Sequence, residues 1–132
     1  MSKENAMIGD YNHVKADRLV NAELQRQNRM WGVDRDDHTK GELMMAALSQ
    51  LDALAVRQDG DAKAFEQVPA SYPENWTGFR DYGSDIANLV VAAAWLHQEI
   101  ARKLRAGEDE TRLPRDPVKQ PYGDVQPSVL TS

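Results

Sequence analysis

The sequence contains no cysteine, which excludes disulfides, cysteine-ligated zinc sites and thiol nucleophiles. It also has no apolar run close to the roughly 18–20 residues that a membrane helix needs. The N-terminus, Met1-Ser2-Lys3, is not followed by the apolar core of a signal peptide. Together these absences predict a cytoplasmic protein without a membrane partner.

Basic residues are in the minority, with 16 Lys and Arg against 21 Asp and Glu, so the formal net charge is −5. This balance disfavours a nucleic acid polymer or an anionic lipid surface as partner. A small polyanion stays compatible, because a bound divalent cation reverses the local sign of the charge.

Gly-rich phosphate loops and GxSxG elbows are absent too. The remaining residues best support attack by a metal-activated water.

Apolar residues recur mainly at spacings of three and four, which predicts an all-α fold. We expect helices over about 13–30, 39–57 and 80–105. The second would begin with a capping box, Thr39 with Glu42 three residues later. The third is apolar nearly all round between Ile86 and Leu96, which is typical of a buried central helix.

Irregular segments separate and follow the helices. Residues 58–78 carry Pro, Gly and three aromatic residues, and long loops of this kind are often functional. Four of the six prolines lie after residue 108, which predicts one helical domain over 1–107 and an extended tail over 108–132. Three helices leave apolar surface uncovered, so we expect a homodimer or homotetramer.

Two groups of acidic residues, each at the start of an expected helix, are the best candidates for a catalytic site. Asp81 and Asp85 would share one face of the third helix, with Asn88 following on the same stripe. Glu42 follows His38 by four residues, and the segment before it contributes Asp37. Helix faces that offer oxygen ligands beside small residues suit Mg²⁺ or Mn²⁺.

Simpler interpretations stay open for most of these residues. Glu42 can serve only the capping box, Asp81 can act only through the helix dipole, and Asp37 and His38 can form a solvated loop. Asp85 precedes the most apolar stretch, so we expect it at the interior edge, where a carboxylate needs a partner such as a cation.

Aromatic and basic side chains are candidates for holding a substrate. Trp31 and Trp76 can stack on a base or simply fill the core. Lys40 and Arg80 can meet phosphate oxygens or remain surface charges. Trp95, inside the apolar helix, is expected in the core.

The order of these features resembles the phage and bacterial dATP/dGTP diphosphohydrolases, a branch of the MazG-like all-α NTP pyrophosphohydrolases. The resemblance covers roughly residues 20–105, and its most specific part is the block Asp36-Asp37-His38-Thr39-Lys40-Gly41-Glu42-Leu43. Further matching segments are Glu23-Leu24-Gln25-Arg26-Gln27, Trp31-Gly32, Ala46-Ala47, Tyr72-Pro73-Glu74-Asn75-Trp76, Arg80-Asp81 and Glu99-Ile100-Ala101-Arg102.

The wider family binds Mg²⁺ through E-x-x-E on one helix and E-x-x-D on the next. Glu42 matches the last acid of the first pair, but His38 or Thr39 stands where the first acid belongs, so Asp37 or His38 would supply the missing ligand. Asp85 matches the final Asp, whereas Asp81 lies four residues before it instead of three.

The resemblance implies a pyrophosphohydrolase that converts a purine (d)NTP, dGTP or dATP, to the monophosphate and pyrophosphate. It also implies that the product dGMP could serve phage 2-aminoadenine synthesis. In this hypothesis Glu42 and Asp85 are catalytic, and they bind the metal with Asp37, His38 and Asp81. The rival hypothesis is a non-enzymatic helical interaction or regulatory protein of a phage.

Overall fold

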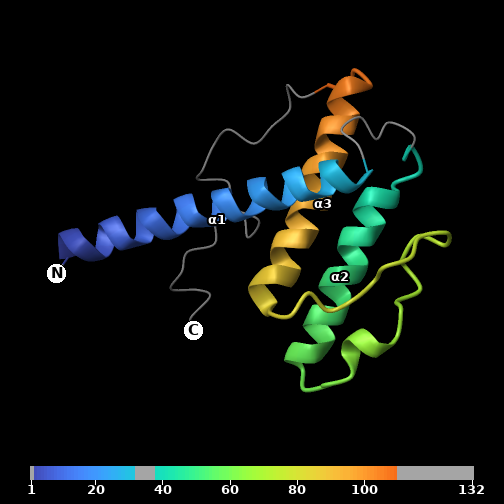
Figure 1. Cartoon of the computed structure of the whole chain (residues 1–132), viewed down its shortest axis with the longest axis horizontal. Helices are drawn as coiled ribbons and strands as arrows, with labels where there is room; N and C mark the ends of the chain where they lie inside the picture. The colour runs from blue at the N-terminus through green and yellow to red at the C-terminus, as the bar shows by residue number, and fades with distance from the viewer. Residues whose placement is uncertain (1, 32–37, 110–132) are drawn as a thin grey trace, which may run out of the picture.

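The computed structural model describes the backbone of residues 2–31 and 38–109, and the side chains of residues 11–30 and 38–109. The elements are α1 (Ser2–Trp31), α2 (Glu42–Gln58), the 3₁₀ turn η1 (Ala64–Glu66) and α3 (Asp85–Arg105) (Figure 1). Within these residues the chain is all-helical and has no strand, as the apolar spacing predicts. The long irregular segment between α2 and α3 is also confirmed, and it contains only η1.

Helices α2 and α3 form an antiparallel pair. Arg57 at the end of α2 bonds to Asp85 at the start of α3. One to two turns further in, Gln50 of α2 bonds to Asn88 of α3. The register therefore pairs the end of α2 with the beginning of α3, and the start of α2 lies opposite the second half of α3.

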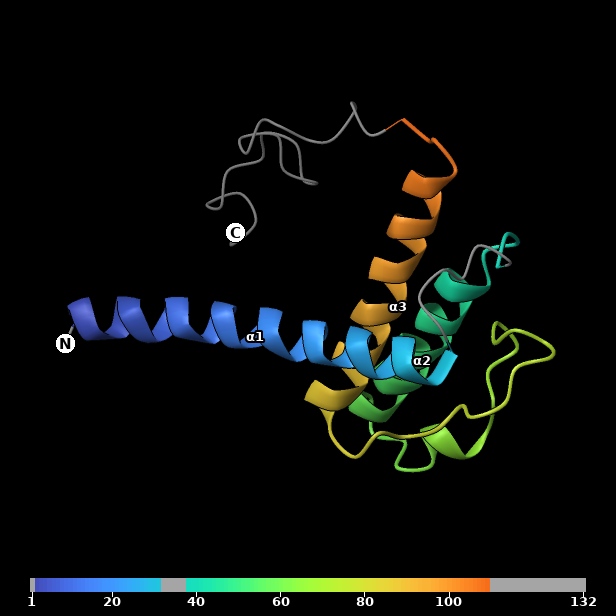
Figure 2. The ribbon, with the colours of Figure 1, turned by 45° about the horizontal axis from the view of Figure 1, so that its top comes forward.

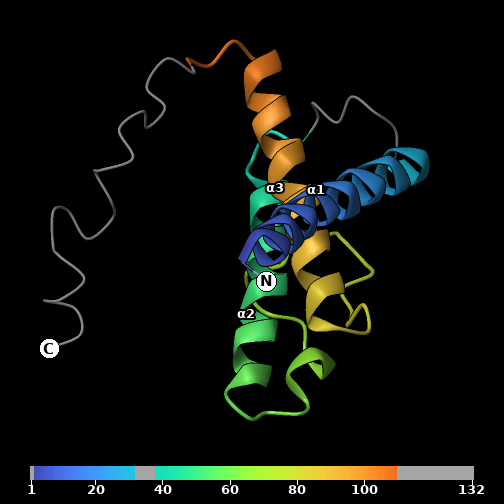
Figure 3. The ribbon, with the colours of Figure 1, turned by 90° about the vertical axis from the view of Figure 1, so that its left-hand side faces the viewer.

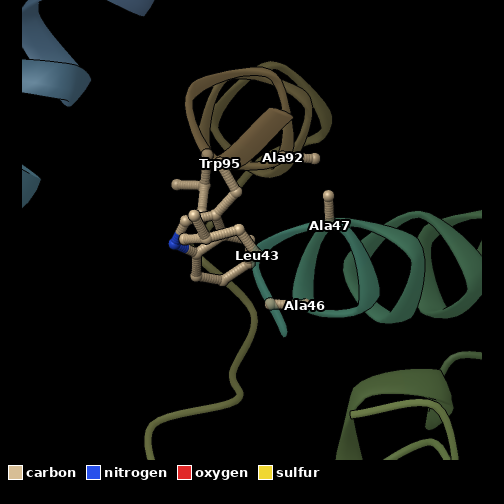
Figure 4. Packing of buried hydrophobic residues seen from close by; sticks show 6 residues of the cluster. Leu43, Ala46, Ala47, Ala92 and Trp95 are labelled. Carbon is tan, nitrogen blue, oxygen red and sulfur yellow. The ribbon is translucent and has the colours of Figure 1, made fainter. Parts of the chain in front are cut away.

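The core lies between these two helices. Figure 4 shows Trp95 and Ala92 of α3 pointing toward Leu43 and Ala47 of α2. Ala46, Ala47 and Ala92 are almost completely buried. Such small side chains let two helix backbones approach closely, and Leu43 and Trp95 fill the wider end of the interface. The expectation that Trp95 belongs to the core is confirmed.

The starts of α2 and α3 differ from the predicted ones. Gly41, at φ 79°, is the residue before α2 and offers no side-chain cap, so the predicted capping box with Thr39 is wrong. Helix α3 begins at Asp85 and not near residue 80, because Ser84 accepts a hydrogen bond from the backbone N–H of Ala87 at 3.0 Å. Asp81 therefore lies in the turn before the helix.

Two helix ends agree with the sequence. Helix α2 ends at Gln58, within one residue of the expected position. Helix α3 ends before Gly107, which has φ 82°. The N–H groups of Gly107 and Glu108 donate to the carbonyls of Leu104 and Lys103, at 3.0 and 3.1 Å. This pair of hydrogen bonds is a Schellman motif, which favours glycine at its left-handed position.

Helix α1 begins far earlier than the predicted residue 13 and stands out from the α2–α3 pair (Figure 2). Figure 3, which looks toward its N-terminal end, shows α1 crossing in front of α3. Residues 11–19 are all exposed, and the contact with α3 is made by the later turns around Gln27. Other elements therefore cover little of residues 11–19 in the described part of the chain.

The outer face of α3 is exposed in the single chain. Ile86, Leu89 and Ile100 retain 64, 48 and 60% of their accessible surface. The prediction of a helix buried on all sides is therefore wrong for one protomer, since α1 and α2 cover only part of its circumference. No helix in the described part of the chain is both long and apolar enough to cross a membrane.

Candidate functional site

A cavity of about 430 Å³ opens where α1, α2, α3 and the segment 72–82 meet. Its volume lies in the range of small-molecule sites. The lining residues are Arg26, Met30, His38, Leu43, Tyr72, Trp76, Thr77, Gly78, Arg80, Tyr82, Trp95 and Gln98. It thus combines several aromatic rings with two arginines.

The aromatic wall comes from the loop between α2 and α3. Trp76 meets His38 with ring centroids 5.0 Å apart, and Tyr72 meets Trp76 edge-on at 6.3 Å. The loop is held against α2 by a 2.7 Å hydrogen bond between the Ser49 and Ser71 hydroxyls. The Tyr72 hydroxyl donates to the carbonyl of Thr77, and burial raises the pKa of this phenol above its usual value. The loop therefore presents a fixed set of rings to the cavity.

Two guanidinium groups lie near one ring of the cavity wall. The Cζ atoms of Arg80 and Arg26 lie 4.7 and 5.9 Å from the centroid of the Tyr82 ring. Arg26 forms a forked pair with Glu23, at 2.7 and 2.6 Å, and this pairing raises its pKa. Arg80 is exposed and forms no ion pair within the described residues. It is a cation with its charge open to a ligand.

Buried amides hold the segment that carries Arg80 and Tyr82. The side-chain nitrogen of Gln50 donates to the Arg80 carbonyl at 2.9 Å and to Asn88 Oδ1 at 2.7 Å. Asn88 Oδ1 also accepts the N–H of Tyr82 at 3.0 Å. Gln50 and Asn88 are fully buried. The two amides thereby fix the backbone on which both cavity residues stand.

A second amide chain borders the cavity on the α1 side. Gln27 Nε2 donates to Glu23 Oε2 at 2.8 Å, and Gln98 Nε2 donates to Gln27 Oε1 at 2.6 Å. Gln27 is fully buried, whereas Gln98 lines the cavity. This chain ties α1 to α3 beside the arginines.

Asp81 and Asp85 are held by a cation of the chain itself. Arg57 Nη1 donates to Asp81 Oδ2 at 2.5 Å, and Arg57 Nη2 donates to Asp85 Oδ1 at 2.9 Å. The hydrogen bond from Asn88 lowers the pKa of Asp81, and the Gly83 N–H and Arg57 act in the same direction. The Asp85 side chain keeps 56% of its exposure, so its expected place at the interior edge is wrong.

Glu42 begins α2 and is not among the residues that line the cavity, although its neighbour Leu43 is. Its Oε1 accepts the Lys40 N–H at 2.7 Å. Its own backbone N–H is the largest cause of its lowered pKa, and Lys40 and the nearby His38 contribute to the same lowering. The carboxylate therefore satisfies amide groups at the start of the helix, in addition to any other role.

The structure does not bring Glu42 together with Asp81 and Asp85. Glu42 begins α2, whereas Arg57, which holds both aspartates, stands one residue before its end. At 1.5 Å per residue this separation is about 22 Å along the helix. The predicted single metal site across the two helix starts is therefore wrong, because antiparallel helices place their starts at opposite ends. The small residues expected to border it, such as Ala46 and Ala92, pack the helix interface instead.

Residues of the predicted metal set do not form a cluster in the described part of the chain. Among the described side chains, those of residues 11–30 and 38–109, no three His, Asp or Glu come together as a potential metal-binding group. Asp37 lies outside the described residues. His38 lines the cavity and meets the Trp76 ring of its aromatic wall.

The predicted substrate-binding residues divide into three groups. Trp76 and Arg80 do line the cavity. Lys40 is exposed outside it, and Asn88 is fully buried, so the prediction that Asn88 touches a substrate is wrong. Trp31 ends α1, but its side chain lies outside the described residues.

Sequence reasoning missed Arg26, Tyr82 and Gln98 as cavity residues. Arg26 and Gln27 are part of a segment that carried the family resemblance, and this was a usable signal. Nothing in the sequence pattern predicts Gln98 as a cavity residue, because its position depends on how α1 crosses α3. Comparison with known proteins adds no further evidence, since no family model, no curated protein and no solved structure matches the chain.

Proposed function

We propose that this protein is a purine (d)NTP pyrophosphohydrolase that binds its substrate, as the Mg²⁺ or Mn²⁺ complex, in the aromatic and arginine-lined cavity. The observation that carries the proposal is the position of Arg80 beside Tyr82, Tyr72 and Trp76 in one cavity of about 430 Å³. Nucleotides combine a flat aromatic base with a polyanion, and this cavity offers a partner to each part.

Arg80 and Arg26 supply the positive charge for the phosphates. A guanidinium group binds phosphate oxygens through paired hydrogen bonds and keeps its charge at any physiological pH. Arg80 has no competing carboxylate within the described residues, whereas Arg26 shares its charge with Glu23. We therefore assign the stronger phosphate contact to Arg80.

The aromatic wall accounts for the base. Stacking of a base on an aromatic side chain is worth about 1–3 kcal/mol. Trp76 lines the cavity, is only partly buried and meets the cavity residues Tyr72 and His38 edge-on, so part of its ring stays accessible to a base. Trp95, which is 3% exposed, forms the floor of the cavity.

Glu42 directly precedes the cavity residue Leu43, and its carboxylate suits a metal that arrives with the triphosphate. Mg²⁺ in nucleotide sites commonly uses one or two carboxylates together with phosphate oxygens and water. Glu42, between the cavity residues His38 and Leu43, would hold it together with Asp37. The bound ion would neutralise charge and lower the pKa of a water. That water would attack phosphorus, its proton would pass to Glu42, and the α–β anhydride would break to release pyrophosphate.

A pyrophosphate-release assay with dATP and dGTP, in Mg²⁺ and in Mn²⁺, tests this function. We expect activity in the wild type and a loss of substrate affinity of about tenfold or more in Arg80→Ala. Arg18→Ala is the matched control, because Arg18 is an exposed arginine on α1 away from the cavity. No pyrophosphate from any purine (d)NTP, or an unchanged Arg80→Ala variant, contradicts the proposal.

A second candidate is a non-enzymatic interaction protein. The exposed apolar residues of α3, Ile86, Leu89 and Ile100, favour it. Homo-oligomerisation through the same face, which we also propose, would cover them without excluding an enzyme. Thermal unfolding with and without Mn²⁺ and dATP separates the two candidates, since only a nucleotide-binding protein gains stability from the ligand.

A further inference from the structure

The amide chain from Glu23 to Gln98 ends at the wall of the cavity. Arg26 holds both oxygens of the Glu23 carboxylate, which as a carboxylate can only accept hydrogen bonds. The side chain of Gln27 must therefore turn its NH₂ toward Glu23 and its carbonyl oxygen toward Gln98. This oxygen in turn requires an NH₂ from Gln98, which is observed at 2.6 Å.

The orientation of the Gln98 amide is thus fixed by the Glu23 carboxylate, two hydrogen bonds away along the chain. An amide that is free to rotate presents its oxygen or its nitrogen to a ligand with little preference. If the Gln98 amide rotated, its carbonyl oxygen would face the carbonyl oxygen of Gln27, and two acceptors would oppose each other. Because the Gln27 side chain is fully buried, this rotation is unfavourable. Gln98 Oε1 has no partner within the described residues and is not enclosed.

We propose that Gln98 selects a 6-aminopurine over a 6-oxopurine by presenting its fixed carbonyl oxygen, with the second hydrogen of its NH₂ beside it, to the edge of the base. An adenine edge offers the complementary pair, an amino donor at position 6 and a ring-nitrogen acceptor next to it. Hypoxanthine reverses both, with an oxygen at position 6 and a hydrogen on N1. This inference rests on the proposed function, and it resolves the choice between dATP and dGTP in favour of dATP.

The same fold contains a second chain that serves as an internal comparison. Asp81 Oδ1 accepts from Asn88 Nδ2 at 2.9 Å, and Asn88 Oδ1 accepts from Gln50. This chain also ends in a carbonyl oxygen, Gln50 Oε1, but that oxygen is buried and lacks a partner. The carboxylate-anchored arrangement is therefore used twice, and only the chain through Gln27 ends at a residue that lines the cavity.

Binding of dATP and dITP, measured by tryptophan fluorescence with Ca²⁺ in place of Mg²⁺ to suppress hydrolysis, tests the inference. These two nucleotides differ only in the polarity of the edge at positions 1 and 6. We expect wild-type protein to bind dATP roughly tenfold or more tightly than dITP. In Gln98→Met the ratio should fall to about one, through loss of dATP affinity and not through gain of dITP affinity.

The positioning role of Gln27 has its own readout. In Gln27→Met the Gln98 amide can rotate, so the variant should bind dITP better than wild-type protein does while it retains dATP binding. If Gln27 had only a structural role, Gln27→Met would weaken the binding of both nucleotides equally. Gln25→Met is the matched control, because Gln25 is an exposed glutamine on the same helix.

The outcomes separate this inference from the function on which it rests. If neither nucleotide binds, the inference is refuted, and the pyrophosphate-release assay with dGTP then decides whether the proposed function fails as well. If both bind with similar affinity to wild-type protein, the nucleotide site stands and the role of Gln98 is refuted. A wild-type ratio near one refutes the inference even if a variant does not fold.

Discussion

Gln50 and Asn88 join α2 to α3 by a 2.7 Å hydrogen bond between two side chains that are completely buried. Asn88 additionally contacts the Tyr82 N–H and Asp81. Buried amides are stable only while their hydrogen bonds are satisfied. This pair therefore makes the position of the cavity segment depend on the helix interface.

Replacement of Asn88 by Ala should destabilise the fold by about 2–3 kcal/mol, because it leaves Gln50 and the Tyr82 N–H without their shared acceptor. Urea unfolding followed by circular dichroism measures the change. Asn21→Ala, at an exposed position of α1, should lie within about 0.5 kcal/mol of wild type. Equal effects in the two variants would contradict the burial argument.

Leu43 and Leu48 offer a matched comparison on one helix. Leu43 is 4% exposed against Trp95, whereas Leu48 is 42% exposed. Leu43→Ala should cost about 2–5 kcal/mol through lost burial and a cavity, and Leu48→Ala much less. Unfolding midpoints in urea give both values. A large loss for Leu48→Ala would instead show that a second protomer covers that position.

The left-handed backbone at Gly41 should penalise any residue with a Cβ. Its φ is 79°, but the nearest atom to a built Cβ, Met44 Cε, is 3.7 Å away, so the cost is conformational and not steric. Gly41→Ala should lose about 1–2 kcal/mol in thermal or urea unfolding. Gly41→Asn should lose less, since asparagine tolerates this region better.

Acid should weaken the turn before α3. The pKa of Asp81 is lowered in the fold from an ordinary value of 3.8, chiefly by the hydrogen bond from Asn88. The stability it contributes is therefore fully present above its unfolded pKa and is lost as the pH falls from about 4 through the lower folded pKa. Asp81→Asn should flatten the dependence of unfolding free energy on pH between about 5 and 2.

An exposed aspartate provides the control for this experiment. Asp52→Asn changes a residue on α2 that has no ion pair in the described part of the chain. It should leave the steepness of the acid transition as in wild type. If both variants flatten the curve equally, the effect comes from net charge and not from the turn.

Glu42 and Asp85 distinguish the relocated site from the one that the sequence predicts. Glu42→Gln should abolish Mg²⁺-dependent pyrophosphate release while it retains nucleotide binding, because it removes the metal-binding and proton-accepting oxygen. Asp85→Asn should stay active, since Asp85 bonds to Arg57 and neither residue lines the cavity. The reverse result would restore the metal site at the start of α3.

Local signals in the sequence were good predictors of the helices. The apolar spacing of Leu43 and Leu54 predicts the existence of α2 and its end, and Gly107 predicts the end of α3, whereas the starts of both helices differ. Pattern alone could not give the direction in which α2 and α3 meet. A helix start rich in carboxylates has the same sequence pattern whether the neighbouring helix runs parallel or antiparallel. The pattern therefore predicts a shared metal site for Asp85 and Glu42, whereas the structure pairs Asp85 with Arg57.

Residues of the cavity were predictable only in part. Trp76 and Arg80 stand in a loop whose length and aromatic content pointed to function. Gln27 and Gln98 lie 71 positions apart, and their side chains meet only because α1 crosses α3. Polar residues at helical spacing do not predict such a contact. Long-range amide pairs therefore remain the least predictable part of this site.

The crossing of α1 has a consequence for the order in which the protein assembles. Helices α2 and α3 with their connecting loop form one hairpin, whereas the α1 residues Arg26 and Met30 reach the cavity only when α1 docks. A ligand that contacts both would add its binding free energy to that docking step alone. Amide hydrogen exchange in the later turns of α1 would then slow on ligand binding more than exchange in the hairpin, so that α1 reports occupancy of the site.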